Sequence, residues 1–242
     1  MMIHDTAIVS KESDIAKNVI IGPYSIIHAG VKIGKNTSIG SHCEIGVHTR
    51  LASKKELVIG ANSTIRSHSV FYLGSQFDDG LITGHNVNVR ENIIAARSLQ
   101  IGSYSELQGD STFGKYVRLQ SNVFVGKYSV IEDYVWLLPY SMLTNDLTPP
   151  SDHLIGPKLL KFATICAGAL IMPGITIGRH SMVAAQACVT RDVSDYTLVA
   201  GIPAKPIKST MDLLLRDGTN RAAYPWAHHF TRGYPPSIVE EI

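Results

Sequence analysis

The chain has 242 residues, a formal net charge of +2 and 17% charged residues, without a run of lysine or arginine. This balance gives no electrostatic footprint for nucleic acid or for an anionic membrane. No apolar segment is long enough to span a bilayer, and the opening residues, MMIHDTAIVSK, lack the charged start and apolar core of a signal peptide. We therefore expect a cytoplasmic protein.

An aliphatic residue recurs at every sixth position from the start of the chain. The first run comprises Ile3, Val9, Ile15, Ile21, Ile27, Ile33, Ile39, Ile45 and Leu51. The spacing resumes from Ile59 to Phe71, weakens, returns between Val89 and Leu137, and forms a last run from Ile165 to Val189. A period of six fits neither an α-helix nor an alternating strand, but it fits a three-sided prism in which each face contributes one inward side chain. The predicted fold is all-β, a parallel β-helix over residues 1–207.

Three interruptions of the repeat predict places where the chain bulges out of the prism. The first, Ala52 to Leu57, is short and charged, and we interpret it as a solvated bulge. The second, Gly74 to Gly84, contains Asp78 and Asp79, but histidine and cysteine are missing at ligand spacing, so we expect no metal site. The third, at about residues 142–163, contains three prolines and predicts one long external loop that acts as a lid or as an arm to a neighbouring subunit.

Beyond residue 207 the period stops, and residues 208–242 form a second, smaller region. Ser209 to Arg216 predicts a short amphipathic helix, with Ser209 or Thr210 as N-cap and Gly218 beyond its end. The remaining residues are rich in aromatic side chains and proline, and we expect them to pack as an irregular tail.

Several segments give the chain a resemblance to a known family. They are IHDTAIV with its following Ile-Gly steps, TGHNVNVREN at 83–92, LQSNVFVG at 119–126, LTNDLTPP at 143–150 and VAGIPAKPI at 199–207. These segments resemble the hexapeptide-repeat acyltransferases, and the middle ones are similar to nucleotide-amino-sugar N-acetyltransferases. The resemblance covers residues 1 to about 207. It implies a left-handed β-helix, acetyl-coenzyme A as co-substrate, and a homotrimer with the coenzyme lying between neighbouring prisms.

Acyl transfer to an amine requires different catalytic groups from acyl transfer to an alcohol. A neutral amine is already a capable nucleophile that must be held and aimed, whereas an alcohol needs a general base, usually histidine. Among the ten histidines we rank His85 first, because it lies within TGHNVNVREN. His85 either assists proton removal or orients the donor, or it is a corner histidine that hydrogen-bonds the backbone or a carboxylate.

The resemblance also indicates residues that hold the acceptor. Asn122 and Gln120 match the polar pair that positions a sugar amine in relatives, although asparagine also forms ladders in solenoids. Asn145 and Asp146 match the Asn-Asp pair of the external loop, which is also ordinary turn chemistry.

Two large aromatic residues before the loop depart from the family pattern, which places glycine with proline, histidine or asparagine there. Trp136 and Tyr140 either stack on a nucleotide base or sugar or fill a bulge. If they line the pocket, the acceptor differs from that of the relatives.

For coenzyme A, the resemblance points to small residues that let the pantetheine approach the prism, although tight corners also require such residues. The expected contacts are backbone groups around Ala167, Gly168, Ala184 and Ala185. In the closing signature, Lys205 is the first candidate cation for a phosphate, followed by Arg191 and Lys161.

These observations predict an acetyl-coenzyme A dependent N-acetyltransferase that acts on a nucleotide-linked amino sugar for a surface polysaccharide such as lipopolysaccharide. One alternative is an O-acetyltransferase of a sugar or small alcohol, with His85 as general base. Another alternative is a non-catalytic β-helix scaffold that assembles partners through its flat faces.

Overall fold

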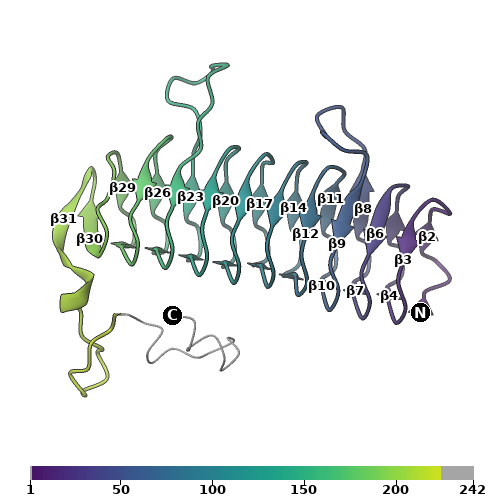
Figure 1. Ribbon diagram of the computed structural model, residues 1–242, viewed down its shortest axis with the longest axis horizontal. Coiled ribbons are helices and arrows are strands. Elements are labelled where there is room, and N and C mark those ends of the chain that lie inside the picture. The colour runs from purple at the N-terminus through teal and green to yellow at the C-terminus, as the bar shows by residue number, and fades with distance from the viewer. Residues whose placement is uncertain (1, 225–242) are drawn as a thin grey trace.

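The computed structural model of the protein describes residues 2–224 and shows an elongated, three-sided β-solenoid (Figure 1). Short strands follow one another around the three faces, and most pair in parallel with the strands one coil before and one coil after. The fold is a left-handed parallel β-helix, so the predicted fold class is confirmed.

We number the faces of the prism in chain order. Face 1 consists of β1 (Met2–Ile3), β4 (Ile20–Ile21), β7 (Ser38–Ile39), β10 (Thr64–Ile65), β13 (Ile82–Thr83), β16 (Gln100–Ile101), β19 (Arg118–Leu119), β22 (Trp136–Leu137), β25 (Thr164–Ile165), β28 (Met182–Val183), β30 (Thr197–Gly201) and β31 (Ala204–Ser209). Face 2 consists of β2 (Ile8–Val9), β5 (Ile26–Ile27), β8 (Glu44–Val47), β11 (Val70–Tyr72), β14 (Asn88–Val89), β17 (Glu106–Leu107), β20 (Phe124–Val125), β23 (Met142–Leu143), β26 (Leu170–Ile171) and β29 (Cys188–Val189). Face 3 consists of β3 (Asp14–Ile15), β6 (Val31–Ile33), β9 (Leu57–Ile59), β12 (Gln76–Phe77), β15 (Ile94–Ala95), β18 (Thr112–Phe113), β21 (Val130–Ile131), β24 (Lys158–Leu159) and β27 (Thr176–Ile177).

One side chain per short strand fills the interior of the prism. Ile45, Ile101 and Leu137 are typical, with at most 2% of each residue exposed. Burial of this apolar surface drives the coils to stack. In regular coils, paired residues lie 18 positions apart, as Thr112 and Val130 do. Equivalent positions of successive coils therefore lie about 4.8 Å apart.

At the edges of the prism the chain turns through residues with positive φ, and these residues form columns. The edge 1–2 column, between faces 1 and 2, comprises Tyr24, His42, His68, Asn86, Tyr104, Asn122, Tyr140, Gly168 and Gln186. The edge 3–1 column, between faces 3 and 1, comprises Asn18, Asn36, Asn62, Gly80, Ser98, Tyr116, Tyr134, Phe162, His180 and Tyr196. A side chain at one of these positions thus lies next to the side chains one coil before and one coil after it in the column.

Two loops leave the prism on the same side, at edge 2–3 between faces 2 and 3 (Figure 1). The first loop spans residues 48–56, between β8 and β9, and the second spans residues 144–157, between β23 and β24. Leu51, which the sixfold spacing placed in the core, lies in the first loop and is 57% exposed. That prediction was wrong because the insertion begins at residue 48, before the period reaches Leu51.

The second predicted interruption, Gly74 to Gly84, is a regular part of the solenoid. Strands β12 and β13 continue the coil there, and Phe77 and Thr83 are buried. Asp79 stabilises the stacking of this edge, because its Oδ1 accepts a hydrogen bond from the backbone N–H of Ala61 at 2.7 Å.

The C-terminal end differs from the predicted amphipathic helix. Strands β30 and β31 pair antiparallel, and a single 3-10 turn, η1 (Thr210–Asp212), follows with Ser209 as its N-cap. The helix stops because Leu213 is extended and packs on the aromatic residues of edge 3–1. Trp226, Tyr234, His228 and His229 lie outside the described residues. Within residues 2–224, no helix has the length and apolarity needed to cross a membrane.

Candidate functional site

Edge 1–2 gathers most of the residues that the sequence singled out. His85, Ala167 and Ala185 occupy equivalent corner positions, each one residue before a member of the edge 1–2 column. Asn122, Tyr140 and Gly168 are consecutive members of the column itself, and Gln120 lies two residues before Asn122. His85, Gln120, Asn122 and Tyr140 therefore share one edge of the solenoid with the small residues Ala167, Gly168 and Ala185.

The imidazole of His85 is held by one of its two nitrogens. Its Nδ1 lies 2.6 Å from the hydroxyl oxygen of Ser67 in the preceding coil, and its backbone N–H donates to the Ser103 hydroxyl at 2.9 Å. The side chain is exposed, and its Nε2 has no hydrogen-bond partner among residues 2–224. A histidine oriented through Nδ1 with a free Nε2 is arranged to exchange a proton or to hydrogen-bond a ligand.

The amides of Asn122, which is half-buried, and of Gln120, which is exposed, have no hydrogen-bond partners among residues 2–224. The backbone N–H of Asn122 donates to the Ser103 carbonyl at 2.9 Å, whereas its side chain makes no hydrogen bond within the described part of the chain. The alternative of an asparagine ladder is not formed here, because the neighbours of Asn122 in the column are Tyr104 and Tyr140. Asn122 and His85 are two coils apart, which is about 9.6 Å along the axis.

Asn145 and Asp146 lie on the second loop, at edge 2–3 of the same coil as Tyr140. Asp146 accepts hydrogen bonds from the Ser151 hydroxyl and backbone N–H and from the Thr148 N–H, at 2.8 to 3.0 Å. Desolvation opposes ionisation, but these donors outweigh it and lower the pKa of Asp146. The carboxylate thus stabilises a turn of the loop and is poorly suited to accept a proton.

Trp136 lies on the outer side of face 1 and is half-buried, with the guanidinium carbon of Arg118 5.6 Å from its ring centroid. Tyr140 is 67% exposed on edge 1–2. The two aromatic residues predicted to flank the acceptor therefore point in different directions from one coil.

Two of the three predicted phosphate-binding cations meet at the end of the solenoid. Arg191 and Lys205 line a pocket of about 890 Å³ at the β30–β31 hairpin, together with Asp192, Thr190 and Pro203. The Asp192 carboxylate accepts a hydrogen bond from the backbone N–H of Thr176 at 2.8 Å. Both cations are exposed. Lys161 lies elsewhere, because its Nζ is 3.2 Å from Asp133 Oδ2 on edge 3–1.

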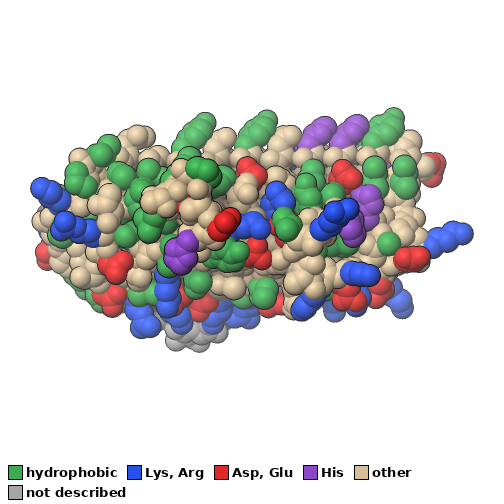
Figure 2. All heavy atoms as spheres, turned by 90° about the horizontal axis from the view of Figure 1, so that it is seen from above, with side chains coloured by type: hydrophobic (Ala, Val, Ile, Leu, Met, Phe, Trp, Pro, Cys, Tyr) green, Lys and Arg blue, Asp and Glu red, His purple; other side chains and the backbone are tan. Residues whose placement is uncertain are grey.

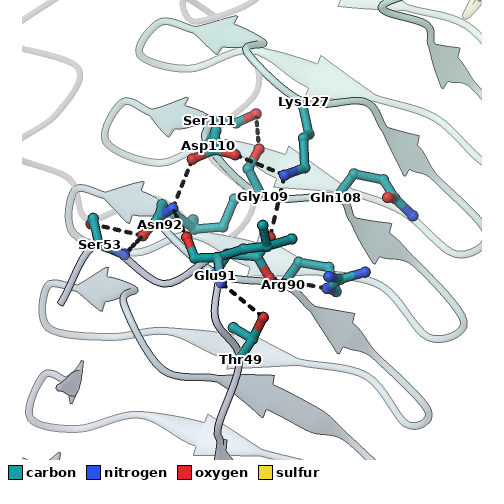
Figure 3. A network of polar contacts seen from close by, with 12 residues as sticks. Thr49, Ser53, Arg90, Glu91, Asn92, Gln108, Gly109, Asp110, Ser111 and Lys127 are labelled. Atoms are coloured by element: carbon teal, nitrogen blue, oxygen red, sulfur yellow. Dashed lines mark hydrogen bonds and ion pairs between the residues drawn. The ribbon is translucent and has the colours of Figure 1, made fainter. Parts of the chain in front are cut away.

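A charged network that the sequence reasoning missed lies on edge 2–3 between the two loops (Figure 3). Glu91 is fully buried, and its carboxylate is 3.1 Å from Arg90 Nε and 3.3 Å from Lys127 Nζ. Lys127 also reaches Asp110 Oδ2 at 2.9 Å. Burial of Lys127 opposes its charge, but the two carboxylates outweigh this effect and raise its pKa.

This network anchors the first loop to the prism. Asn92 Nδ2 donates to Asp110 Oδ1 at 2.8 Å and to the Leu51 carbonyl at 3.0 Å, and its Oδ1 accepts from the backbone and hydroxyl of Ser53 (Figure 3). The signal in the sequence is the spacing of 18 between Asn92 and Asp110, which places them in one column. Because two cations face two carboxylates, the cluster is internally neutral and has a structural role.

Part of the sequence is similar to known hexapeptide-repeat proteins, whose repeat length matches the coils described above. Residues 12–47 match the family described as "Bacterial transferase hexapeptide (six repeats)". A chloramphenicol acetyltransferase of Agrobacterium fabrum is 40% identical over 28% of this chain and 31% of its own length. An acyl-[acyl-carrier-protein]–UDP-N-acetylglucosamine O-acyltransferase of Thermodesulfovibrio yellowstonii is 31% identical over 46% of this chain and 42% of its own. The chain thus spans less than half the length of either relative.

Among solved structures, a UDP-N-acetylglucosamine acyltransferase from Bacteroides fragilis has the same fold. Its TM-score is 0.56 at 16% identity, over 99% of this chain and 81% of that one. The repeat, the corner geometry and this likeness define a hexapeptide-repeat left-handed β-helix. The chain resembles the bacterial hexapeptide-repeat transferases, with the family match at residues 12–47.

Proposed function

We propose that the protein is an acetyl-coenzyme A dependent N-acetyltransferase of a nucleotide-linked amino sugar, acting in the cytoplasm in the synthesis of a surface polysaccharide. The observation that carries the proposal is the set of unpaired polar groups on edge 1–2, His85 Nε2 and the amides of Gln120 and Asn122. These groups lie on a fold whose relatives include proteins named as acetyltransferases and as an acyltransferase of a UDP-sugar.

The residues present fit coenzyme A. Ala167 and Ala185 leave the backbone of edge 1–2 accessible, and the pocket at Arg191 and Lys205 provides two cations for phosphate groups. The two places lie on different parts of one chain. A homotrimer in which neighbouring prisms frame one site would let both contribute, and the flat faces of the prism suit three-fold packing.

In the proposed reaction, the amine nitrogen attacks the thioester carbonyl, the N–C bond forms and the C–S bond breaks. The amine proton passes to the departing thiolate, with His85 Nε2 as the group that relays it or holds the donor. Gln120 and Asn122 orient the acceptor without changing charge. Most of the rate enhancement then comes from positioning, because a neutral amine needs no strong base.

The geometry of His85 also supports O-acetylation as a second candidate, because an imidazole fixed through Nδ1 is suited to act as a general base. The variant His85→Asn distinguishes the two reactions. With an alcohol acceptor we expect kcat to fall by about 10²- to 10⁴-fold, whereas an amine acceptor should tolerate the change within about tenfold. The variant His42→Asn, on the same edge but two coils before His85 and separated from it by the coil of Ser67 and His68, serves as the control.

Release of free thiol is the direct assay of the proposed function. Nucleotide amino sugars and simple alcohols are each supplied with acetyl-coenzyme A and with longer acyl donors, and the thiol is followed. Coenzyme A should also raise the melting temperature of the protein, as any ligand of the native state does. A scaffold without activity would neither release thiol nor respond to coenzyme A, and this pair of results would overturn the proposal.

A further inference from the structure

The edge 1–2 column begins as an unbroken stack of rings. The rings of Tyr24 and His42 lie with centroids 5.0 Å apart at 25°, and those of His42 and His68 lie 5.0 Å apart at 4°. Each corner residue follows its neighbour by one coil, so the backbone repeat sets this spacing. Figure 2 shows hydrophobic and histidine side chains projecting in a row along one long edge of the molecule. At these three successive coils the column therefore accommodates a ring. We call each position of the column a rung.

Beyond His68 the stack has gaps. Asparagine replaces a ring at Asn86 and again at Asn122, with Tyr104 between them and Tyr140 after the second gap. The backbone stays regular, with φ of 60° at Tyr104, 60° at Asn122 and 63° at Tyr140. Tyr104 and Tyr140 are therefore two rungs apart, or about 9.6 Å. The space between them has the width that His42 fills between Tyr24 and His68.

The corner hydrogen bonds keep this gap from closing. The backbone N–H of Asn122 donates to Ser103 at 2.9 Å, and that of Tyr140 donates to Ser121 at 3.2 Å. Tyr104 is 64% exposed and Tyr140 is 67% exposed, and neither ring stacks on another ring of the described residues. Each tyrosine therefore offers a bare face to the gap.

The floor of the gap is an unsatisfied amide. Elsewhere in the chain, corner asparagines satisfy one another, as when Asn18 Nδ2 donates to Asn36 Oδ1 at 3.2 Å and Asn36 Nδ2 donates to Asn62 Oδ1 at 3.1 Å. Asn122 has no such partner within residues 2–224, because the adjacent rungs carry tyrosines. A side-chain amide offers a donor and an acceptor side by side, which matches the hydrogen-bonding edge of a nucleobase.

We infer that the gap between Tyr104 and Tyr140, above Asn122, is a nucleobase-binding slot. Base stacking on aromatic side chains needs a flat, neutral ring, and the slot offers two phenol faces and an uncharged floor. The inference rests on the proposed function, which supplies two sources of a base, the acceptor nucleotide and the adenine of coenzyme A. His85 lies two coils from Asn122, on the other side of Tyr104, about 9.6 Å along the axis from the slot.

Filling the slot tests the inference with the least disturbance. The variant Asn122→Tyr supplies the missing ring at a corner where Tyr104 and Tyr140 already adopt the same backbone conformation. We expect it to abolish binding of the base while raising the melting temperature through two new ring contacts. Asn86→Tyr fills the other gap, between His68 and Tyr104, and is the matched control. It should retain nucleotide binding, because that gap has only one phenol wall.

Removing one wall gives an independent measurement. Loss of a stacking ring weakens base binding by about 5- to 150-fold, so Tyr104→Ala should weaken binding in this range, whereas Tyr24→Ala on the same edge should not. Binding is measured by isothermal titration calorimetry with UDP, dTDP, ADP and coenzyme A, and with inorganic pyrophosphate as the probe without a base. Far-ultraviolet circular dichroism confirms that each variant keeps its β-helix.

The pattern of losses identifies the source of the base. If Asn122→Tyr abolishes binding of UDP or dTDP but leaves coenzyme A unaffected, the slot holds the base of the acceptor. If it abolishes binding of ADP and coenzyme A instead, the slot holds adenine. Equal binding of pyrophosphate and UDP, or unchanged nucleotide binding in Asn122→Tyr, overturns the inference even if thiol release shows that the enzyme works. Slot-dependent binding of nucleotides without any thiol release overturns the proposed transferase and leaves the slot standing.

Discussion

The corners of edges 1–2 and 3–1 have the same backbone conformation, but their columns of side chains differ. On edge 3–1 the rings form an unbroken stack, with centroid distances of 5.6 Å from Tyr116 to Tyr134, 4.9 Å from Tyr134 to Phe162 and 4.5 Å from Phe162 to His180. On edge 1–2 the stack is interrupted at Asn86 and Asn122. A solenoid therefore converts a stabilising column into a candidate ligand site by leaving out a ring.

The two edges also differ in what covers them. Residues Leu213, Ala223 and Tyr224 pack against the rings of edge 3–1, and Tyr224 is buried. Burial raises the pKa of the Tyr224 phenol to about 12. Edge 1–2 has no comparable cover among the described residues, and its tyrosines are mostly exposed. This difference fits the proposed division, in which edge 3–1 contributes to stability and edge 1–2 binds the ligand.

The largest effect is expected from breaking the continuous stack. Phe162→Ala removes a buried ring that contacts both Tyr134 and His180, and the cost should be about 3 to 5 kcal/mol of unfolding free energy. The matched change on edge 1–2, Tyr104→Ala, should cost less than about 0.5 kcal/mol because that ring is exposed and unstacked. Urea unfolding followed by circular dichroism measures both. Equal losses would mean that the two columns do not differ in role.

A smaller effect is expected from the asparagines. Asn36 exchanges side-chain hydrogen bonds with both neighbours on edge 3–1, whereas Asn86 has none within residues 2–224. Replacement by alanine imposes similar backbone strain at both, since φ is 58° at Asn36 and 56° at Asn86. Asn36→Ala should therefore be less stable than Asn86→Ala by about 1 kcal/mol. A difference near zero in chemical denaturation would show that the exposed ladder contributes nothing.

The prism could be predicted from the sequence because each inward position needs an apolar side chain, and these positions recur at every sixth residue. It misplaced Leu51 because an aliphatic residue inside a loop can fall on the period by chance. The predicted loop, residues 142–163, is longer than the observed one because it includes strands β23 and β24. The inward residues of these strands, Leu143 and Leu159, are 16 positions apart, which is not a multiple of six. Period counting finds the core but not the length of an insertion.

The candidate site was predicted residue by residue but not as an arrangement. The resemblance supplied His85 and Asn122, and only the coil length of 18 shows that they lie on one edge and two rungs apart. Tyr104 was missed because its environment depends on Asn122 and Tyr140, which are 18 and 36 positions away. Comparing residues at intervals of 18 would have found parts of the two columns, such as Tyr104 to Tyr140 and Tyr116 to Tyr134, but the two loop insertions change the interval elsewhere and hide the rest.

The smallest effect concerns the histidine within the continuous stack. His180 lies between Phe162 and Tyr196, and its Nδ1 is buried without a hydrogen-bond partner. Burial, helped by the nearby Arg179 and opposed by Asp195, lowers the pKa of His180 below its ordinary value of 6.5. The unfolded chain therefore takes up a proton at this residue before the native protein does, so stability should decrease as the pH falls below about 6.5.

The variant His180→Phe continues the stack without a titrating group, and it should lose this part of the acid sensitivity while remaining at least as stable at neutral pH. Melting temperatures between pH 7.5 and 5 measure the difference, and identical pH profiles for the two proteins would show that the stacked imidazole takes up its proton as readily in the native state as in the unfolded chain.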